Sequence, residues 1–539
     1  MRAPKNIAEL LTPFLPKEAG SPPKLETLLG GILATEGYFS PNFEFSESEG
    51  AETTQQISVD PGPQTRIANV DLSITGSLDE AARQTLINAW LLPVGQTFRQ
   101  ADWTRAKQQV LSELLARDYA AAKLADSTAL IRADDEQADL SAHYQTGPRY
   151  RFGELVVDGL QRYTPDLVQR YNTDVRLGEP YQEKSLSALQ SRLQSSPYFS
   201  AVQVSLEQEE ATSVNDDGSV SAPVRVLVRE RPLHRLSFGA GASSNTGLRT
   251  EVNYQTIALF GEPWQLISGL RIEQKQQTAY ADVFFPPDDK NRNNSLGFLL
   301  ENSNIEDLKT QRYAFGAQTI QMRGSVEQRL SLNWQQERST PSGADEMRSK
   351  ALVPAAMWTW RRIDNLLDPR DGIALQAQIG AASKWALSDQ NFVRFYGRYQ
   401  QFIPLGARNT LALRAEGGYT AAPSRTGIPQ DYLFRTGGAN SVRGYAYQSL
   451  GVADGSAIIG GRYLAILSGE VTHWINEQWG AAAFVDAGNA VDDLANLNLA
   501  LGYGLGARWR SPAGPIGLDL AYGQRDARFQ LHFSLAIPF

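Results

Sequence analysis

The stretch Phe529-Gln530-Leu531-His532-Phe533-Ser534-Leu535-Ala536-Ile537-Pro538-Phe539 alternates between large apolar side chains and smaller or polar ones. Because successive side chains of a β-strand point to opposite faces, this pattern predicts a strand with one continuous apolar face. Such a face suits either the lipid around a membrane barrel or the interior of a soluble sandwich. The sequence before it decides between the two.

The same alternation recurs in sixteen runs between residues 234 and 539, separated by turn residues. Runs of about ten residues with a two-residue period are typical of transmembrane β-barrels, which in bacteria have an even number of strands. We therefore predict an antiparallel sixteen-stranded barrel over residues 232–539. The predicted strands are 234–244, 248–259, 263–274, 277–285, 294–302, 311–322, 325–338, 348–361, 372–383, 391–403, 409–420, 461–475, 479–490, 498–510, 514–523 and 528–539.

The first 231 residues contain a long internal repeat. Similar junctions begin at Gly62-Pro63, Gly147-Pro148 and Arg231-Pro232, which are 85 and 84 residues apart (147 − 62 and 231 − 147). A regular period of this length indicates related modules in a row. We predict three of them, at residues 1–62, 63–146 and 147–231.

Each full module is predicted to be an α+β unit with the order β-α-α-β-β. In the third, residues 150–157 alternate like a strand, Thr164-Pro165 can begin a helix, and residues 183–196 form a second helix. The first module has a helix at residues 24–36 but no strand predicted before it, so the chain looks truncated there.

Composition argues against several other classes of protein. A net charge of −8 and a pI near 5.3 do not suit binding to nucleic acid through a basic face. The absence of cysteine excludes disulfides and thiolate metal sites, and no two of the four histidines have metal-ligand spacing. No catalytic constellation is found, so we expect neither an enzyme nor a cofactor or metal site.

The longest predicted loop, about residues 421–460, contains Gly437-Gly438-Ala439-Asn440-Ser441-Val442-Arg443-Gly444-Tyr445. Long loops without structure of their own are usually functional. On the predicted strand 479–490, Phe484, Asp486 and Gly488 are two residues apart and share one face. The aspartate is expected to face the interior of the barrel, where its charge stays hydrated or paired.

Val442-Arg443-Gly444-Tyr445 and Phe484-Val485-Asp486-Ala487-Gly488 resemble two motifs of the BamA/TamA superfamily. The modules resemble its POTRA domains, and the terminal Phe539 resembles the C-terminal signal of outer-membrane proteins. The resemblance implies that the loop folds back into the barrel and that Arg443 pairs with Asp486. Phe484 would then stack on the guanidinium, Gly488 would leave room, and Glu470 is a weaker partner.

Three modules before a barrel resemble the TamA-like assembly factors of this family. The resemblance implies a protein of the bacterial outer membrane, with the modules in the periplasm, that helps to insert autotransporters and other outer-membrane proteins. It also implies a TamB-like partner anchored in the inner membrane, and contact with membrane lipids and lipopolysaccharide. Phospholipid transport with that partner, and export through the pore as in two-partner secretion, stay open as alternatives.

The seam between the first and last strands is the remaining predicted site. Glycine weakens strand pairing, and proline has no amide hydrogen to donate. We therefore predict a weakly paired lateral seam that opens into the membrane. Its residues are Ser237, Gly239 and Gly241 on the first strand, and Ser534, Pro538 and Phe539 on the last.

Overall fold

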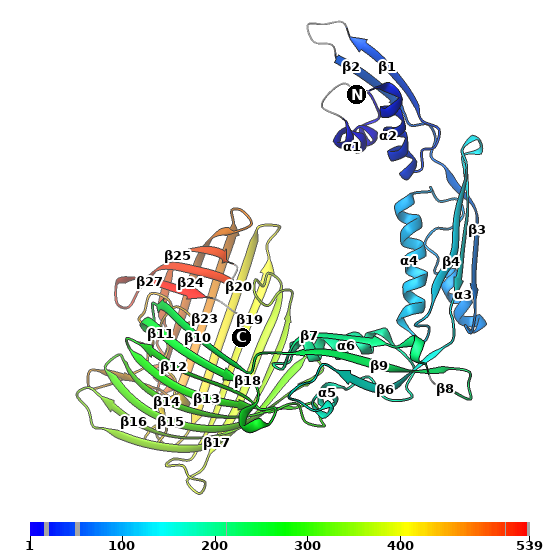
Figure 1. Ribbon diagram of the computed structural model, residues 1–539. Helices are drawn as coiled ribbons and strands as arrows, with labels where there is room; N and C mark the ends of the chain where they lie inside the picture. Colours follow the sequence, from blue (N-terminus) through cyan, green and yellow to red (C-terminus); the bar gives the residue numbers. More distant parts are fainter. Residues whose placement is uncertain (16–20, 49–53, 212, 512–513, 536–539) are drawn as a thin grey trace. The chain divides into compact units, whose positions relative to one another are not determined.

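The structure is a computed structural model that describes residues 1–15, 21–48, 54–211, 213–511 and 514–535 (Figure 1). These residues fall into two compact units. One comprises residues 1–168 and 172–230, and the other residues 169–171 and 231–539. The units are described one after the other.

The described part of the first unit contains three small sheets, one in each predicted module. Their strand orders are β1-β2, β3-β5-β4 and β6-β9-β7, with β8 paired to β9. The elements are α1 (Lys5–Leu11), α2 (Pro22–Thr35), β1 (Asn42–Ser48), β2 (Thr54–Asp60), β3 (Arg66–Thr75), α3 (Glu80–Asn88), α4 (Gln100–Ala116), β4 (Lys123–Arg132), β5 (Gln137–Gln145), β6 (Tyr150–Asp158), α5 (Pro165–Tyr171), α6 (Glu183–Ser195), β7 (Phe199–Leu206), β8 (Ser213–Val214) and β9 (Val220–Glu230).

The second and third modules follow the predicted order. The opening strand pairs in parallel with the closing one, β3 with β5 and β6 with β9, and the strand between them in sequence adds on antiparallel. In α4, Trp103, Val110 and Leu114 recur at helical spacing and are buried against the sheet. The boundaries between modules remain a prediction.

The first module contains a helix that the sequence did not indicate. Helix α1 precedes the predicted helix at residues 24–36, and its Ile7 and Leu11 are buried in the same cluster as Leu29. Arg2 also forms a parallel bridge to Ser58, in the place that an opening strand takes in the other modules. A helix of two turns is too short to show a clear apolar period, which is why the sequence did not indicate it.

The second unit is a nearly closed antiparallel barrel, which confirms the predicted fold. Its described strands form one sixteen-stranded sheet that runs from β10 to β27 in chain order (Figure 1). They are β10 (His234–Ser243), β11 (Gly247–Thr256), β12 (Gln265–Glu273), β13 (Gln276–Phe284), β14 (Asn293–Ile305), β15 (Leu308–Arg323), β16 (Val326–Pro341), β17 (Met347–Ile363), β18 (Gly372–Ala382), β19 (Phe392–Pro404), β20 (Asn409–Ala421), β23 (Tyr463–Trp474), β24 (Trp479–Val491), β25 (Ala500–Ser511), β26 (Gly514–Gly523) and β27 (Arg528–Leu535).

Strands β14 and β15 are longer than predicted. The sequence indicated an end near residue 302, where the side chains become polar, but the ladder continues to Ile305 paired with Leu308. Leu308 is buried with Ala457 and Ile459 of the small hairpin formed by β21 (Val452–Asp454) and β22 (Ala457–Ile459). Packing against this hairpin extends the strands past the alternating segment.

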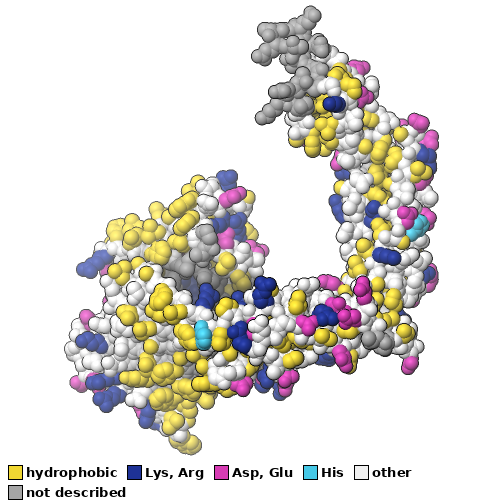
Figure 2. All heavy atoms as spheres, viewed as in Figure 1, with side chains coloured by type: hydrophobic (Ala, Val, Ile, Leu, Met, Phe, Trp, Pro, Cys, Tyr) yellow, Lys and Arg dark blue, Asp and Glu magenta, His cyan; other side chains and the backbone are white. Residues whose placement is uncertain are grey.

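Side chains on the two faces of the barrel wall differ as the alternation predicts. On β27, Phe529 and Leu531 are 69% and 61% exposed, whereas His532 between the outward positions is 3% exposed. Hydrophobic side chains gather on the outer face of the strands in Figure 2. An outer apolar surface of this kind suits contact with lipid.

Among the described helices, none has the length and apolar character needed to cross a membrane.

The segment between β20 and β23 folds back against the inner face of the wall. Val442 and Tyr445 are fully buried, in a cluster with Ile466 of β23, Ala490 of β24 and Ala500 of β25. Residues 437–445 of this segment are called the loop tip below. The loop tip positions the candidate site.

Candidate functional site

Arg443 of the loop tip is held by Asp486 of β24 through three hydrogen bonds. Its backbone N donates to Oδ2 at 3.0 Å, Nε donates to Oδ2 at 2.7 Å, and Nη2 donates to Oδ1 at 3.0 Å. Arg443 is 6% exposed and Asp486 is fully buried. A buried, bidentate, charge-assisted pair of this kind fixes both position and orientation.

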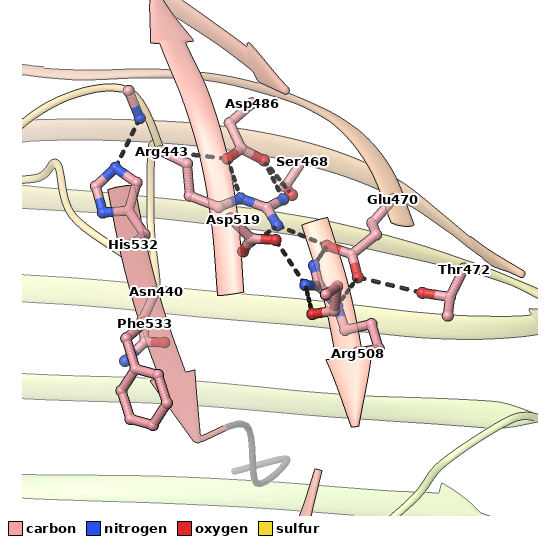
Figure 3. A network of polar contacts seen from close by, with 12 residues as sticks. Asn440, Arg443, Ser468, Glu470, Thr472, Asp486, Arg508, Asp519, His532 and Phe533 are labelled. Carbon is pink, nitrogen blue, oxygen red and sulfur yellow. Dashed lines mark hydrogen bonds and ion pairs between the residues drawn. The ribbon is translucent and has the colours of Figure 1, made fainter. Parts of the chain in front are cut away.

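The pair belongs to a larger network of charges (Figure 3). Arg443 Nη1 also donates to Glu470 Oε2 at 2.6 Å and to Asp519 Oδ2 at 3.3 Å. Arg508 binds the same two acids, with Nη2 to Glu470 at 2.7 Å and Nη1 to Asp519 at 2.6 Å. Two guanidinium groups therefore face three carboxylates inside the barrel, with one negative charge in excess.

Neighbouring side chains complete the surroundings of Arg443. The guanidinium carbon lies 3.4 Å from the ring centroid of Phe484, which is a stacked cation–π contact. Ser468 Oγ donates to Asp486 Oδ1 at 2.6 Å. Each oxygen of the buried Asp486 thus has a partner, as a buried carboxylate requires.

Glycines in the wall leave room for the loop tip. A Cβ at Gly502 of β25 would lie 1.8 Å from the carbonyl oxygen of Arg443, and one at Gly488 would lie 2.8 Å from Val442 Cγ2. Gly444 has a φ of 91°, a conformation that favours glycine, and its own Cβ would meet the backbone of Gly523 at 2.7 Å. Any larger residue at these positions displaces the loop tip.

Further contacts tie the loop tip to the strands on either side. Gly444 N donates to His532 Nε2 of β27 at 2.9 Å, and Tyr445 Oη donates to the carbonyl of Leu501 at 2.8 Å. Arg414 of β20 donates to the carbonyls of Asn440 and Ser441 at 2.6 and 2.5 Å. The loop tip therefore contacts β20 and the run of strands from β23 to β27.

The structure brings together every predicted residue of the loop-tip site, and adds others. The predicted set is Val442, Arg443, Gly444, Tyr445, Phe484, Asp486 and Gly488. Sequence reasoning did not assign Asp519, Arg508, His532 or Arg414 to it. The available signal was a charged residue on the inward face, such as Asp519 between the outward Leu518 and Leu520. That signal does not reveal which strands meet.

The predicted seam residues are placed only in part. Ser237, Gly239 and Gly241 lie on the half-buried inner face of β10, and Ser534 pairs with Gly517 of β26. Pro538 and Phe539 lie outside the described residues. The described seam residues are spread along two strands, whereas the residues of the loop-tip site contact one another.

No ladder joins β10 to β27 within their described residues, 234–243 and 528–535. The hydroxyl of Ser244 bridges the gap: Oγ donates to the carbonyl of Phe533 at 3.3 Å and accepts from its amide at 3.2 Å. The edges of both strands are otherwise without a paired strand in the part of the chain that the structure describes.

Comparisons with known proteins agree with this architecture. The outer membrane protein assembly factor BamA of Neisseria meningitidis is 23% identical over 446 residues, which are 75% of this chain and 53% of the relative. The chain thus spans about half the length of that relative. The structure of BamA from Haemophilus ducreyi lacking POTRA domains 1-3 is similar in fold, with a TM-score of 0.72, 17% identity, and coverage of 87% of this chain and 99% of that one.

The Omp85 superfamily domain matches residues 166–539. This match covers most of the chain, and it includes the whole barrel, the loop tip and the wall motif around Asp486. The chain belongs to the Omp85 superfamily.

Proposed function

We propose that this protein helps to insert client β-barrel proteins into the bacterial outer membrane, in the manner of TamA-like assembly factors. In this proposal residues 232–539 span the membrane, and the modules at 1–62, 63–146 and 147–231 lie in the periplasm. The observation that carries it is the gap between β10 and β27, where no ladder is formed within the described residues. The role is structural and involves no catalytic residue, metal or cofactor.

The gap is the proposed entry point for a client strand. An unpaired strand edge presents a row of N–H and C=O groups that another strand can bind. Ser237, Gly239 and Gly241 on one side, with Ser534, Pro538 and Phe539 on the other, make up the proposed seam. Main-chain pairing tolerates varied sequences, which suits an assembly factor with many clients.

The loop tip is the proposed latch of this seam. Its contacts run from β20 to β27, so they hold the C-terminal strands together while the seam itself stays unpaired. Arg443 acts as the centre of the latch because it contacts acids from β23, β24 and β26. It supports insertion by fixing the shape of the barrel.

The modules are proposed to deliver clients and to meet a second protein. Their sheets end in strands such as β3 and β4, or β6 and β7, which have a ladder on one side within the described residues. We propose that autotransporters and a TamB-like protein anchored in the inner membrane bind these edges by strand addition. Membrane lipids and lipopolysaccharide would contact the apolar outer face of the barrel.

Cross-linking the seam tests the proposal. Ser244→Cys and Phe533→Cys, joined by a short bis-maleimide, should abolish insertion of an autotransporter barrel into liposomes. Ala242→Cys with Leu248→Cys is the matched control, because these residues already face each other on β10 and β11. Full insertion by the protein with a locked seam would contradict the proposal. The chain has no native thiol to interfere.

The alternatives give different results in the same liposomes. Phospholipid transport predicts lipid exchange that depends on the TamB-like partner and survives the seam lock. Export through the pore predicts passage of an extended protein and a large conductance. The position of the loop tip inside the barrel favours insertion over an open pore.

A further inference from the structure

His532 is the residue through which the loop tip contacts the last strand. It lies on the inner face of β27, is 3% exposed, and accepts a hydrogen bond from Gly444 N at 2.9 Å. Strand β27 pairs with β26 on one side and has no ladder on the other within the described residues. The contact therefore joins the strand that borders the seam to the centre of the loop tip (Figure 3).

The direction of this hydrogen bond fixes the protonation state of the ring. A backbone N–H is only a donor, so Nε2 of His532 must accept, and the ring must be neutral with its proton on Nδ1. A second proton on Nε2 would place two donors against each other. The hydrogen bond to Gly444 is then lost, and the backbone N–H is left without its acceptor.

The charged groups facing His532 come from three elements. Asp519 of β26 is its direct partner across the ladder, Asp486 lies on β24, and Arg443 belongs to the loop tip. Among these three residue types, histidine is the one whose ordinary pKa lies nearest to neutrality. On acidification from neutral pH, the imidazole is therefore expected to be the first of these groups to change its charge.

We propose that His532 is a positioning residue that holds β27 to the loop tip when neutral and releases it when protonated. Acidification would then widen the seam while the Arg443–Asp486 pair stays in place. This inference rests on the proposed function only in taking the seam as the path of the client. The contact itself is a property of the barrel alone.

The remaining three histidines lie elsewhere and serve as controls. His143 contacts Ser73 in the second module, His234 contacts Tyr254, and His473 contacts Asn409 on the rim of β20. None of these contacts includes a residue of the loop tip. His473→Gln is the matched control, because it removes an imidazole ring from the same barrel without touching the loop tip.

The test measures the seam directly in the purified full-length protein. Spin labels at Ala242→Cys and Leu531→Cys, exposed positions that each lie two residues from the Ser244–Phe533 contact, report the width of the seam by pulsed electron resonance at pH 7.5 and 5.0. In the otherwise native chain, and in His473→Gln, the wide-distance population should rise about fivefold to tenfold at pH 5.0, as expected for the loss of one buried hydrogen bond.

His532→Gln separates titration from structure. Its amide oxygen can accept from Gly444 N but does not titrate, so the narrow distance should persist at both pH values. His532→Leu should give the wide distance at both. An equal pH response in native and His532→Gln proteins, or no response in the native protein, would overturn the inference. The distance measurement does not require client insertion. A failure of client insertion would therefore count against the proposed function and not against this inference.

Discussion

The loop tip forms a hydrogen bond with His532 within strand β27. On the other side of the seam it forms one with Asn245, which lies two residues after the end of β10. The two hydrogen bonds measure 2.9 Å for Gly444 N to His532 and 3.4 Å for Ala439 N to Asn245 Oδ1. Behind β27 lie the acids and guanidinium groups of β23 to β26, which include the partners of Arg443. Behind β10, Glu251 of β11 forms ion pairs with Arg249 at 3.9 Å and with Arg271 of β12 at 3.2 Å, and these two arginine side chains are 42% and 40% exposed. One border of the seam is therefore braced by a charge network that includes the buried Arg443 of the loop tip, and the other by part-exposed ion pairs. The predictions below test this contrast.

Arg443→Met should have the largest effect on the braced side. It leaves the buried Asp486 and Asp519 and the half-buried Glu470 facing one guanidinium, and removing one member of a buried pair costs about 3–5 kcal/mol. Asp486→Asn should cost less, because it leaves two acids for two guanidinium groups. The stability of both variants is measured by unfolding in detergent, which is monitored through the heat-dependent shift in gel mobility. Arg323→Met, at an exposed position, is the control. Equal stabilities of Arg443→Met and the native protein would remove the basis of the contrast.

Gly502→Ala should displace the loop tip without changing any charge. Its Cβ would lie 1.8 Å from the carbonyl oxygen of Arg443, and overpacking of this kind costs about 1–3 kcal/mol. Trypsin should then cleave after Arg443, which mass spectrometry of the fragments detects. Gly417→Ala on β20 is the control, because no atom lies within 4 Å of its Cβ position. Protection of Arg443 in both variants would show that the wall tolerates the methyl group.

Glu230→Gln tests the hydrogen bonds that hold the end of β9, just before β10, to residues 161 and 162 of the third module. Glu230 Oε1 accepts from the backbone N of Gln161 and Arg162 at 2.9 Å each. Burial raises the pKa of this carboxyl, but the backbone donors outweigh it and hold the pKa below its ordinary value. The ionised form therefore stabilises the third module above about pH 4.5, and this contribution, about 1–2 kcal/mol, is lost as the pH falls through the lowered pKa.

The contribution of Glu230 is measured by unfolding the full chain in urea, with hydrogen exchange in the third module as the readout. The native protein should lose stability in the module between pH 6 and pH 3, while Glu230→Gln should start lower and change less. The exposed Glu183→Gln on α6 is the control. Parallel curves for the native protein and Glu230→Gln would contradict the assignment.

Ser244→Ala should have the smallest effect on stability. The hydroxyl makes two hydrogen bonds to Phe533, both at an exposed position, so about 0.5–1 kcal/mol is expected. Hydrogen exchange at Phe533 should nevertheless rise, because no other contact to its amide is formed across the described part of the seam. Unchanged hydrogen exchange at this amide would show that the Ser244 hydroxyl does not protect it, and that another contact holds β10 beside β27.

The barrel could be predicted because each strand carries its own alternating pattern. Val485 and Asp486 point to opposite faces whatever the neighbouring strands do, so a single segment suffices. The Arg443–Asp486 pair could be predicted because both residues lie in motifs that resemble a known family. Helix α1 was missed because Ile7 and Leu11 give too few turns for a period.

Asp519 and His532 were missed for a different physical reason. Each is a lone polar residue on an inner face, and dozens of such residues line a barrel. Their meeting with the loop tip depends on the register between β26 and β27 and on the depth to which the loop enters. The register and the depth of the loop are set by packing across strands that lie far apart in sequence. They therefore cannot be predicted from the pattern of a single segment.

The position of the loop tip in the chain has a consequence for the folding of this protein itself. Arg443 binds Glu470, Asp486 and Asp519, and Gly444 binds His532, all of which come later in the sequence. Contacts of this range form late, because the intervening strands must first be brought into place. The loop tip cannot dock until β27 has been synthesised and paired, so its burial marks the completion of the barrel.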